Sequence, residues 1–228
     1  NLKNYQAWGE VKQGGFVDTK TYLTASQIFF EKEGRFQQIE KLSNYLMDKD
    51  SWIVKNDGLE IKTQKIVFCE GAYATENPLW NFLPFRATKG ETLTIKTEAQ
   101  IPDAIFKKDF FLLPIGNKQY KVGATYQWDN LDWEPSDEGK LTLIEKLEEI
   151  LNCPYQIIEH TAGIRPNTND RKPFLGEHPI NKQMFVFNGL GSKGVALVPY
   201  FAGKVCNQLL NNVEPNKEFS ILRFLNNE

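Results

Sequence analysis

Two stretches of the sequence combine residue types that suit the binding of an anion. The first is NGLGSKGVALVP at residues 188–199, where a glycine-rich turn leads straight into a helical pattern. Glycine permits positive φ and close backbone approach, and the start of a helix offers free N–H groups and a positive dipole end. These features suit a phosphate or another electron-rich group. A tight strand-to-helix turn that needs glycine for packing accounts for the same residues.

The second stretch is TAGIRPNTNDRKPFLG at residues 161–176, in which Arg165 follows a strand pattern and precedes Pro166 and a polar loop. A guanidinium group can bind both oxygens of a carboxylate in one fixed plane, which a lysine cannot do. Arg165 is therefore a candidate for recognising a substrate carboxylate. The alternative is a structural ion pair between Arg165 and Asp170 or Glu159.

A third stretch, KIVFCEGAYA at residues 65–74, is an apolar strand pattern that ends in Gly71 and Ala72. Such strands occur in dinucleotide-binding sheets, where small residues let a cofactor lie on the backbone. Many other α/β strands end in the same way, so this motif by itself is weak.

Composition argues against several other kinds of chemistry. The 228 residues carry a net charge of −2, so the chain lacks the basic surface expected of a nucleic-acid-binding protein. No run approaches the ~18 apolar residues of a membrane span. Cys69, Cys153 and Cys206 are widely spaced and predict reduced thiols in the cytoplasm, with no disulfide or zinc site. His160 and His178 are too few for a histidine metal centre and are expected to be structural.

The elements that position these motifs begin with a predicted helix over residues 14–34. Asp18 or Thr19 can cap its start, and Gly34 can end it in a left-handed conformation. Several of its residues lie mostly on one side and predict packing onto a core: Leu23, Ser26, Ile28, Phe29 and Phe30.

Strand patterns follow and change in character from Pro84. Before that point, the sequence predicts a strand near residues 37–42, a turn at residues 56–58 and a strand at residues 65–69. After it, alternating and β-branched residues predict an antiparallel sheet with strands at residues 91–97, 104–113 and 119–126. A hairpin turn at residues 115–118 is expected between the last two strands.

The last part of the chain alternates helices and strands. Ser136 can cap a helix over residues 136–151, whose stripe is predicted to consist of Leu141, Ile144, Leu147 and Leu151. There follow a strand at residues 156–162, a polar loop at 163–179, a strand at 184–188 and a helix to about residue 212. The buried face of this helix is predicted to be formed by Val195, Val198, Ala202, Val205 and Leu209.

Further stretches complete an ordered series with these motifs: GGFVDTKTYLTA, PFRATKGETLTI, FFLLPIGNKQYKVGATYQWDN and, near the end, EFSILRF. In this order the motifs resemble the D-amino-acid oxidase-like family of FAD-dependent oxidoreductases, close to its glycine and sarcosine oxidase branch. The resemblance covers nearly the whole chain, and its middle and C-terminal motifs are specific. One departure is the lack of a GxGxxG turn, which in this family binds the ADP half of FAD near the N-terminus.

The resemblance implies an α+β fold, with an antiparallel β-sheet substrate domain with helices and an incomplete α/β FAD-binding domain. Residues 1–83 and 161–228 are expected to belong to the FAD-binding domain, and residues 84–160 to the substrate-binding sheet. Because the GxGxxG segment is missing, we expect the chain to be a fragment that binds FAD weakly or not at all by itself.

The resemblance also implies a mechanism and a set of site residues. Arg165 would bind the carboxylate of an amine or amino-acid substrate, and hydride would pass from a substrate carbon to flavin N5, so that no side-chain base is required. Phe111 stands where glycine oxidase-like members often carry a tyrosine that helps to hold the carboxylate. The residues expected to contact the flavin are Gly71, Ala72, Gly163, Gly189, Gly191, Ser192, Lys193, Gly194 and Val195. Lys193 either stabilises negative charge on the reduced flavin or points to solvent.

Two other functions stay open at this point. GLGSKG also resembles the oxidase half of a bifunctional enzyme that builds methylaminomethyl-uridine in tRNA, whose substrate is a carboxymethylaminomethyl group on RNA. The acidic charge balance argues against nucleic-acid binding by this chain alone and favours a small-molecule partner. The lack of a nucleotide fingerprint also allows a non-catalytic binding or scaffold domain. The substrate, the electron acceptor and the oligomeric state are not determined by the sequence.

Overall fold

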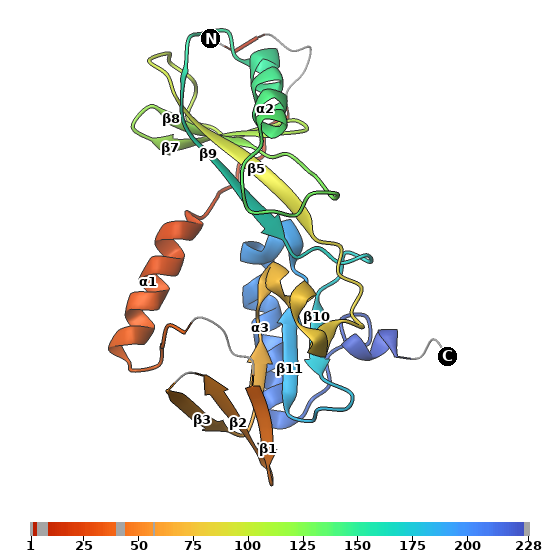
Figure 1. The fold of residues 1–228 in the computed structure, drawn as a ribbon. Coiled ribbons are helices and arrows are strands. Elements are labelled where there is room, and N and C mark those ends of the chain that lie inside the picture. The colour runs from red at the N-terminus through yellow and green to blue at the C-terminus, as the bar shows by residue number, and fades with distance from the viewer. Residues whose placement is uncertain (1, 4–8, 40–43, 57, 226–228) are drawn as a thin grey trace. The chain divides into compact units, whose positions relative to one another are not determined.

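The computed structural model describes residues 2–3, 9–39, 44–56 and 58–225 (Figure 1). The chain forms two compact units, each built from two separate segments. One, here called the sheet unit, comprises residues 1–15 and 86–166. The other, here called the parallel-strand unit, comprises residues 16–85 and 167–228.

The sheet unit contains a five-stranded antiparallel sheet in the order β6-β7-β8-β5-β9. Its elements are β5 (Thr88–Lys96), β6 (Phe106–Lys107), β7 (Phe111–Gly116), β8 (Gln119–Gly123), α2 (Asp137–Ile150) and β9 (Gln156–Arg165). The antiparallel sheet is as predicted, but the single strand expected at residues 104–113 is divided into β6 and β7, and β9 continues beyond the expected residue 162. Gly163 and Arg165 therefore lie in a strand, because pairing with β5 extends to Thr88, and the expected loop begins later.

Neighbouring residues explain two features that were predicted correctly, the turn between β7 and β8 and the start of α2. Between β7 and β8, Asn117 and Lys118 have φ of 51° and 60°. Positive φ at both central residues is the type I′ geometry that suits a two-residue hairpin. At the start of α2, the hydroxyl of Ser136 accepts a hydrogen bond from the Gly139 N–H at 3.0 Å. Both predictions are confirmed.

The core of the sheet unit lies between α2 and one face of the sheet. Leu93, Leu112 and Val122 of the strands pack with Leu143 and Leu147 of the helix. The predicted stripe of α2 was partly wrong. The buried residues are Gly139, Leu143, Leu147 and Ile150, whereas Leu141 is 59% exposed. Helix α2 presents this side to the sheet because the Glu91 carboxylate lies directly against Gly139, where no Cβ would fit.

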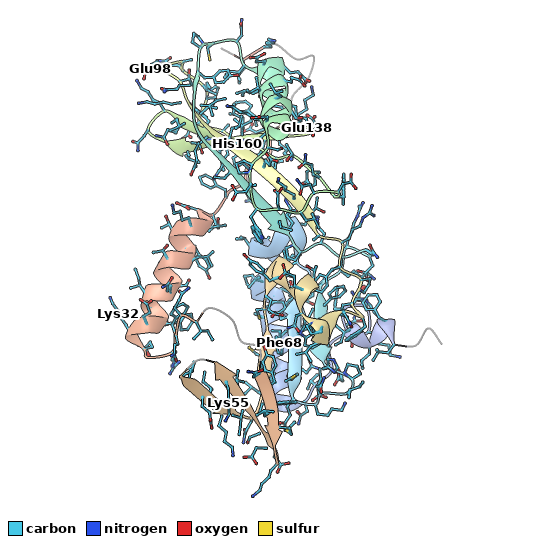
Figure 2. The ribbon with its side chains drawn as sticks, viewed as in Figure 1. Lys32, Lys55, Phe68, Glu98, Glu138 and His160 are labelled. Carbon is cyan, nitrogen blue, oxygen red and sulfur yellow. The ribbon has the colours of Figure 1, made fainter. Side chains whose placement is uncertain are left out.

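The parallel-strand unit contains two three-stranded sheets. The first has the order β10-β11-β4 and consists of β4 (Ile66–Phe68), β10 (Phe174–Glu177) and β11 (Met184–Asn188), with β4 and β11 parallel. Its core is aromatic and includes Phe68, which is labelled in Figure 2, together with Trp80 and Phe174. The strand β10 falls within the stretch that was expected to be a loop.

The second sheet of this unit is antiparallel and consists of β1 (Asn44–Asp48), β2 (Ser51–Asn56) and β3 (Leu59–Thr63). The sequence patterns did not predict β2 and β3, although the turn expected at residues 56–58 lies between them. The strand predicted near residues 37–42 is not found at residues 37–39, and residues 40–42 lie outside the described residues. The strand that the structure has here, β1, begins at Asn44.

Helix α1 (Thr19–Lys32) starts as predicted, because the Asp18 carboxylate accepts hydrogen bonds from the N–H groups of Lys20 and Thr21. Its predicted packing is wrong. None of its residues is buried, and Leu23 and Phe29 are both largely exposed. An apolar pattern on one side of a helix indicates which face tends to pack against other residues. In the described part of the chain, nothing packs over the apolar face of α1.

Helix α3 (Gly194–Asn211) follows a short 3-10 turn, η3 (Gly191–Lys193). Val205 is buried as predicted, but Val195 and Val198 are exposed. The buried side consists of Phe201, Val205 and Gln208. The helix contributes Phe201 and Val205 to a small core with Leu175 of β10, and of its first turn Leu197 is partly buried against that core.

Within the described residues, none of the helices has the length and hydropathy required to cross a membrane. In the same part of the chain, no group of three or more histidine, cysteine or acidic side chains is arranged to hold a metal ion. The three cysteines, Cys69, Cys153 and Cys206, are free thiols.

The core of the sheet unit generates the first prediction. Leu147→Ala should lower the free energy of unfolding by about 2–5 kcal/mol, because Leu147 is completely buried and its truncation leaves a cavity. Leu141→Ala, on the exposed side of the same helix, should change it by less than about 0.5 kcal/mol. Urea unfolding followed by circular dichroism measures both. Equal losses for the two variants would mean that α2 is oriented differently.

Candidate functional site

The structure joins the first and third motifs at one edge of the parallel-strand unit. Because β4 and β11 are parallel neighbours, the turns that follow them lie at the same end of the sheet. In open α/β sheets this is the end at which ligands bind. The side-chain amide of Asn188 donates a hydrogen bond to the carbonyl oxygen of Gly71 at 2.9 Å. The two glycine-containing turns are therefore held against each other.

The glycines of these turns are required for different reasons. Gly71, Gly189 and Gly191 all have positive φ, at 59°, 76° and 55°. A Cβ atom at Gly189 would lie 2.6 Å from Thr168, and one at Gly191 would lie 2.3 Å from Asn167. Packing within the protein therefore explains these two glycines. A Cβ at Gly71 would meet nothing within 4 Å, so the backbone there is open.

The start of α3 has the features that suit an anion. Within the part of the chain that the structure describes, its first turn receives no hydrogen bond from a capping side chain. Ser192, Lys193 and Val195 are exposed beside it, and Gly194 is the first helical residue. Uncapped N–H groups and the positive end of the helix dipole favour negative charge at this place. Ala72, in contrast, is buried and presents little surface.

In the sheet unit, the predicted substrate residues Arg165 and Phe111 and the predicted flavin contact Gly163 share one face of the sheet. The cross-strand pairs on this face are Thr88 with Arg165, Gly90 with Gly163, Thr92 with Gly123, and Gly123 with Phe111. Paired residues of antiparallel strands point to the same side. Arg165, Gly163 and Phe111 therefore lie on the face opposite the α2 core. A Cβ at Gly163 would meet nothing within 4 Å, so this face is open there.

The guanidinium group of Arg165 lies close to the backbone of Gly90 and over the ring of Tyr126. A Cβ at Gly90 would be only 1.9 Å from its Nη2 atom, so glycine makes room for it. Nη1 donates a hydrogen bond to the carbonyl oxygen of Thr125 at 3.3 Å, and the group stacks on the Tyr126 ring at 4.5 Å. Burial lowers the pKa of Arg165, which nevertheless stays protonated at neutral pH.

The structural ion pair considered for Arg165 is not formed. Asp170 pairs with Arg223 at 2.9 Å, and Glu159 accepts a hydrogen bond from Thr94. Among the described residues, Arg165 has no ion pair with any carboxylate. A partly buried guanidinium group without an acidic partner favours binding of an external anion.

Sequence reasoning missed a buried charged network on the other face of β5. Lys89 and Glu91 are only 1% and 0% exposed. The Glu91 carboxylate accepts hydrogen bonds from Ser136 Oγ at 2.7 Å and Ser136 N at 3.0 Å, and lies 2.8 Å from Nε2 of His160. Lys89 Nζ lies 2.5 Å from Asp132 and 3.6 Å from Glu91. The sequence signal that could have revealed this network is the Lys-x-Glu spacing of Lys89 and Glu91 within a strand pattern.

The electrostatics of this network keep it ionised. Burial alone would raise the pKa of Glu91, but hydrogen bonds from Ser136 and His160 and the charge of Lys89 outweigh it, so that the pKa is lowered. His160 has a structural partner here. His178, the other histidine, accepts hydrogen bonds from the N–H groups of Ile180 and Asn181. Both histidines are structural, as predicted.

A model of the family described as FAD-dependent oxidoreductases matches residues 2–208. The chain belongs to this family. Because the match includes the glycine turns, Arg165 and the antiparallel sheet, the expected α+β fold and the resemblance are both confirmed.

Curated relatives include a glycine oxidase from Pseudomonas aeruginosa, 27% identical over 145 residues, which are 61% of this chain and 40% of that protein. A bifunctional protein of tRNA 5-methylaminomethyl-2-thiouridine biosynthesis from Idiomarina loihiensis is 23% identical over 217 residues. That match covers 90% of this chain and 34% of the relative. The chain thus spans less than half the length of these relatives.

Solved structures show the same fold. The iminodiacetate oxidase of Chelativorans superposes with a TM-score of 0.73 at 20% identity, over 88% of this chain and 57% of that one. The glycine oxidase of Geobacillus kaustophilus superposes with a TM-score of 0.66 at 23% identity, over 81% of this chain and 50% of that one.

The buried network generates the second prediction. Glu91→Gln should lower the free energy of unfolding at pH 7 by roughly 2–4 kcal/mol, because it removes the negative partner of a buried lysine. Glu159→Gln, an exposed change on the opposite face of the same sheet, should have an effect below about 0.5 kcal/mol. Urea unfolding compares the two variants with the wild type.

The effect of Glu91→Gln should also depend on pH. The pKa of Glu91 is lower in the folded chain than in the unfolded one, so its stabilisation is present above the unfolded pKa and is lost as pH falls through the folded pKa. The difference between wild type and variant should therefore shrink on going from pH 7 to pH 3. A difference that grows in acid would contradict the lowered pKa.

Proposed function

We propose that this protein acts as an FAD-dependent oxidoreductase that oxidises a C–N bond of an amino acid or an N-substituted amino acid. The observation that carries the proposal is Arg165, a partly buried guanidinium group that faces the open side of the sheet and has no acidic partner among the described residues. Glycine and iminodiacetate, which appear in the names of two relatives, both carry an amine beside a carboxylate.

The residues of the parallel-strand unit fit the cofactor. Gly71 offers an open backbone with positive φ, and the start of α3 offers uncapped N–H groups with Ser192 and Lys193 exposed beside them. We assign flavin contacts to these residues and to Gly189, Gly191, Gly194 and Val195. When bound, FAD supplies the two-electron acceptor for the reaction.

The residues of the sheet unit would position the substrate. Arg165 binds the carboxylate in the plane of its guanidinium group, which fixes the carbon between the carboxylate and the nitrogen. Phe111 on the same face is apolar and cannot donate a hydrogen bond, so Arg165 carries most of the carboxylate recognition. Glu91 and His160 lie on the opposite face of the sheet. We therefore assign neither of them the role of a base.

A second candidate function is oxidation of a carboxymethylaminomethyl group on tRNA. It is favoured by the relative from Idiomarina loihiensis, whose match extends over 90% of this chain. This substrate also places an amine beside a carboxylate, so Arg165 would have the same role. The net charge of −2 favours the small-molecule substrate over RNA.

The third prediction tests the activity itself. The natural full-length protein, supplied with FAD and mixed anaerobically with amino acids and N-methyl amino acids, should lose its absorbance in the visible flavin band with at least one of them. Benzylamine, which has no carboxylate, should not bleach the flavin. Full-length protein that takes up FAD but is bleached equally well by benzylamine would contradict the carboxylate role. Full-length protein that takes up no FAD would favour a non-catalytic domain.

The fourth prediction tests the position of Arg165 without changing it. Gly90→Ala places a methyl group where the guanidinium group lies, and this flexible side chain must move aside. Binding of sarcosine, measured by calorimetry, should weaken about tenfold or more, in line with the 1.5–3 kcal/mol of a charge-assisted hydrogen bond. Gly203→Ala, in a helix with free space around it, should leave binding unchanged. Unchanged affinity in Gly90→Ala would remove Arg165 from the site.

A further inference from the structure

The segment after β8 carries two aromatic side chains on the face that holds Arg165. Gln127 pairs with Lys89 of β5 through two backbone hydrogen bonds of 2.9 and 3.0 Å. Lys89 belongs to the buried face of the sheet, so Gln127 points to that side too. In extended backbone the neighbours alternate, and Tyr126 and Trp128 therefore point to the open face.

These two rings and the guanidinium group form an aromatic ladder, defined here as Arg165, Tyr126 and Trp128. The Arg165 guanidinium carbon lies 4.5 Å from the centre of the Tyr126 ring. The rings of Tyr126 and Trp128 are stacked, 6.5 Å apart with an angle of 29° between their planes. Tyr126 and Trp128 remain 51% and 52% exposed, so the ladder offers free aromatic surface beside an unpaired cation.

The ladder is held in place from behind by the buried network. The Thr125 N–H donates to the Glu91 carbonyl at 3.2 Å, and Lys89 contacts Asp132 further along the same segment. Ser136, where the segment ends, donates to the Glu91 carboxylate. The segment that carries both rings is thus fixed at several points. A surface fixed before the ligand arrives loses little conformational entropy on binding.

We propose that the aromatic ladder selects amino acids that carry a flat, unsaturated substituent, such as an arylmethyl group on the nitrogen. The inference rests on the proposed binding of the substrate carboxylate by Arg165. One face of the guanidinium group is covered by Tyr126, so the carboxylate takes its free edge. A flat substituent then stacks against the exposed rings, whereas the small substituents of glycine and sarcosine leave them uncovered.

Calorimetry on the purified chain tests this with three ligands: sarcosine, N-benzylglycine and N-(cyclohexylmethyl)glycine. The last two have similar size, but only the benzyl group is flat and aromatic. N-benzylglycine should bind roughly five-fold more tightly than the cyclohexylmethyl compound, the increment of an aromatic pair beyond area burial. Trp128→Ala should abolish that preference, and Trp128→Phe should retain most of it. Trp133→Ala, another exposed tryptophan further along the segment, should retain it fully.

The outcomes separate this inference from the proposed function. If Arg165→Met weakens all three ligands but Trp128→Ala leaves the benzyl preference intact, the ladder has no role in selection and the carboxylate role stands. If Arg165→Met leaves sarcosine binding unchanged, the carboxylate role fails and the ladder loses its basis. Displacement of N-benzylglycine by unfractionated tRNA would overturn the assignment to free amino acids, because the flat group recognised would then be a base on RNA.

Discussion

Glu91 brings its carboxylate into the interior of the sheet unit, where partners from the start of α2 and from β9 meet it. Ser136 caps α2 and contacts the carboxylate, His160 reaches it from β9, and Gly139 lets the helix lie against it. A buried carboxylate is tolerated only when it is paired and hydrogen-bonded. The charge therefore requires the helix, the neighbouring strand and the segment after β8 to be in place together. Apolar contacts rarely require the surrounding elements to take so specific an arrangement.

Because successive residues of β5 point to opposite sides, the two faces of the sheet have different roles. Lys89 and Glu91 point into the buried network, while Gly90 lies between them on the open face and accommodates the Arg165 guanidinium group. The motif TKGET thus determines the position of two different features, one on each face of the sheet. Its charged residues fasten the segment that carries Tyr126 and Trp128, and its glycine sets the depth at which Arg165 lies. The residues that hold the segment after β8 and the residue that accommodates Arg165 are therefore immediate neighbours along the strand.

The parts of the fold that follow from neighbouring residues could be predicted from the sequence. The β7–β8 turn and the Ser136 cap need only a few consecutive residues, and the order of motifs identified the family. Orientation depends on distant residues and was less predictable. The buried stripe of α2 is set by Glu91, more than forty positions earlier, and α1 has an apolar side that the described chain does not cover. The sequence likewise named Arg165 but not Gly90, because only strand pairing brings them together.

The glycine turns show why a structural and a functional explanation of one motif need not compete. Gly189 and Gly191 are required by their contacts with Thr168 and Asn167, which is a packing reason. That packing holds the turn in the conformation from which Asn188 reaches the Gly71 carbonyl. The open backbone at Gly71 and the uncapped start of α3 are therefore held in place by the packing of the same two glycines to which we assign flavin contacts. A substitution at Gly191 would then disturb cofactor binding through the position of its neighbours as well as through its own contact.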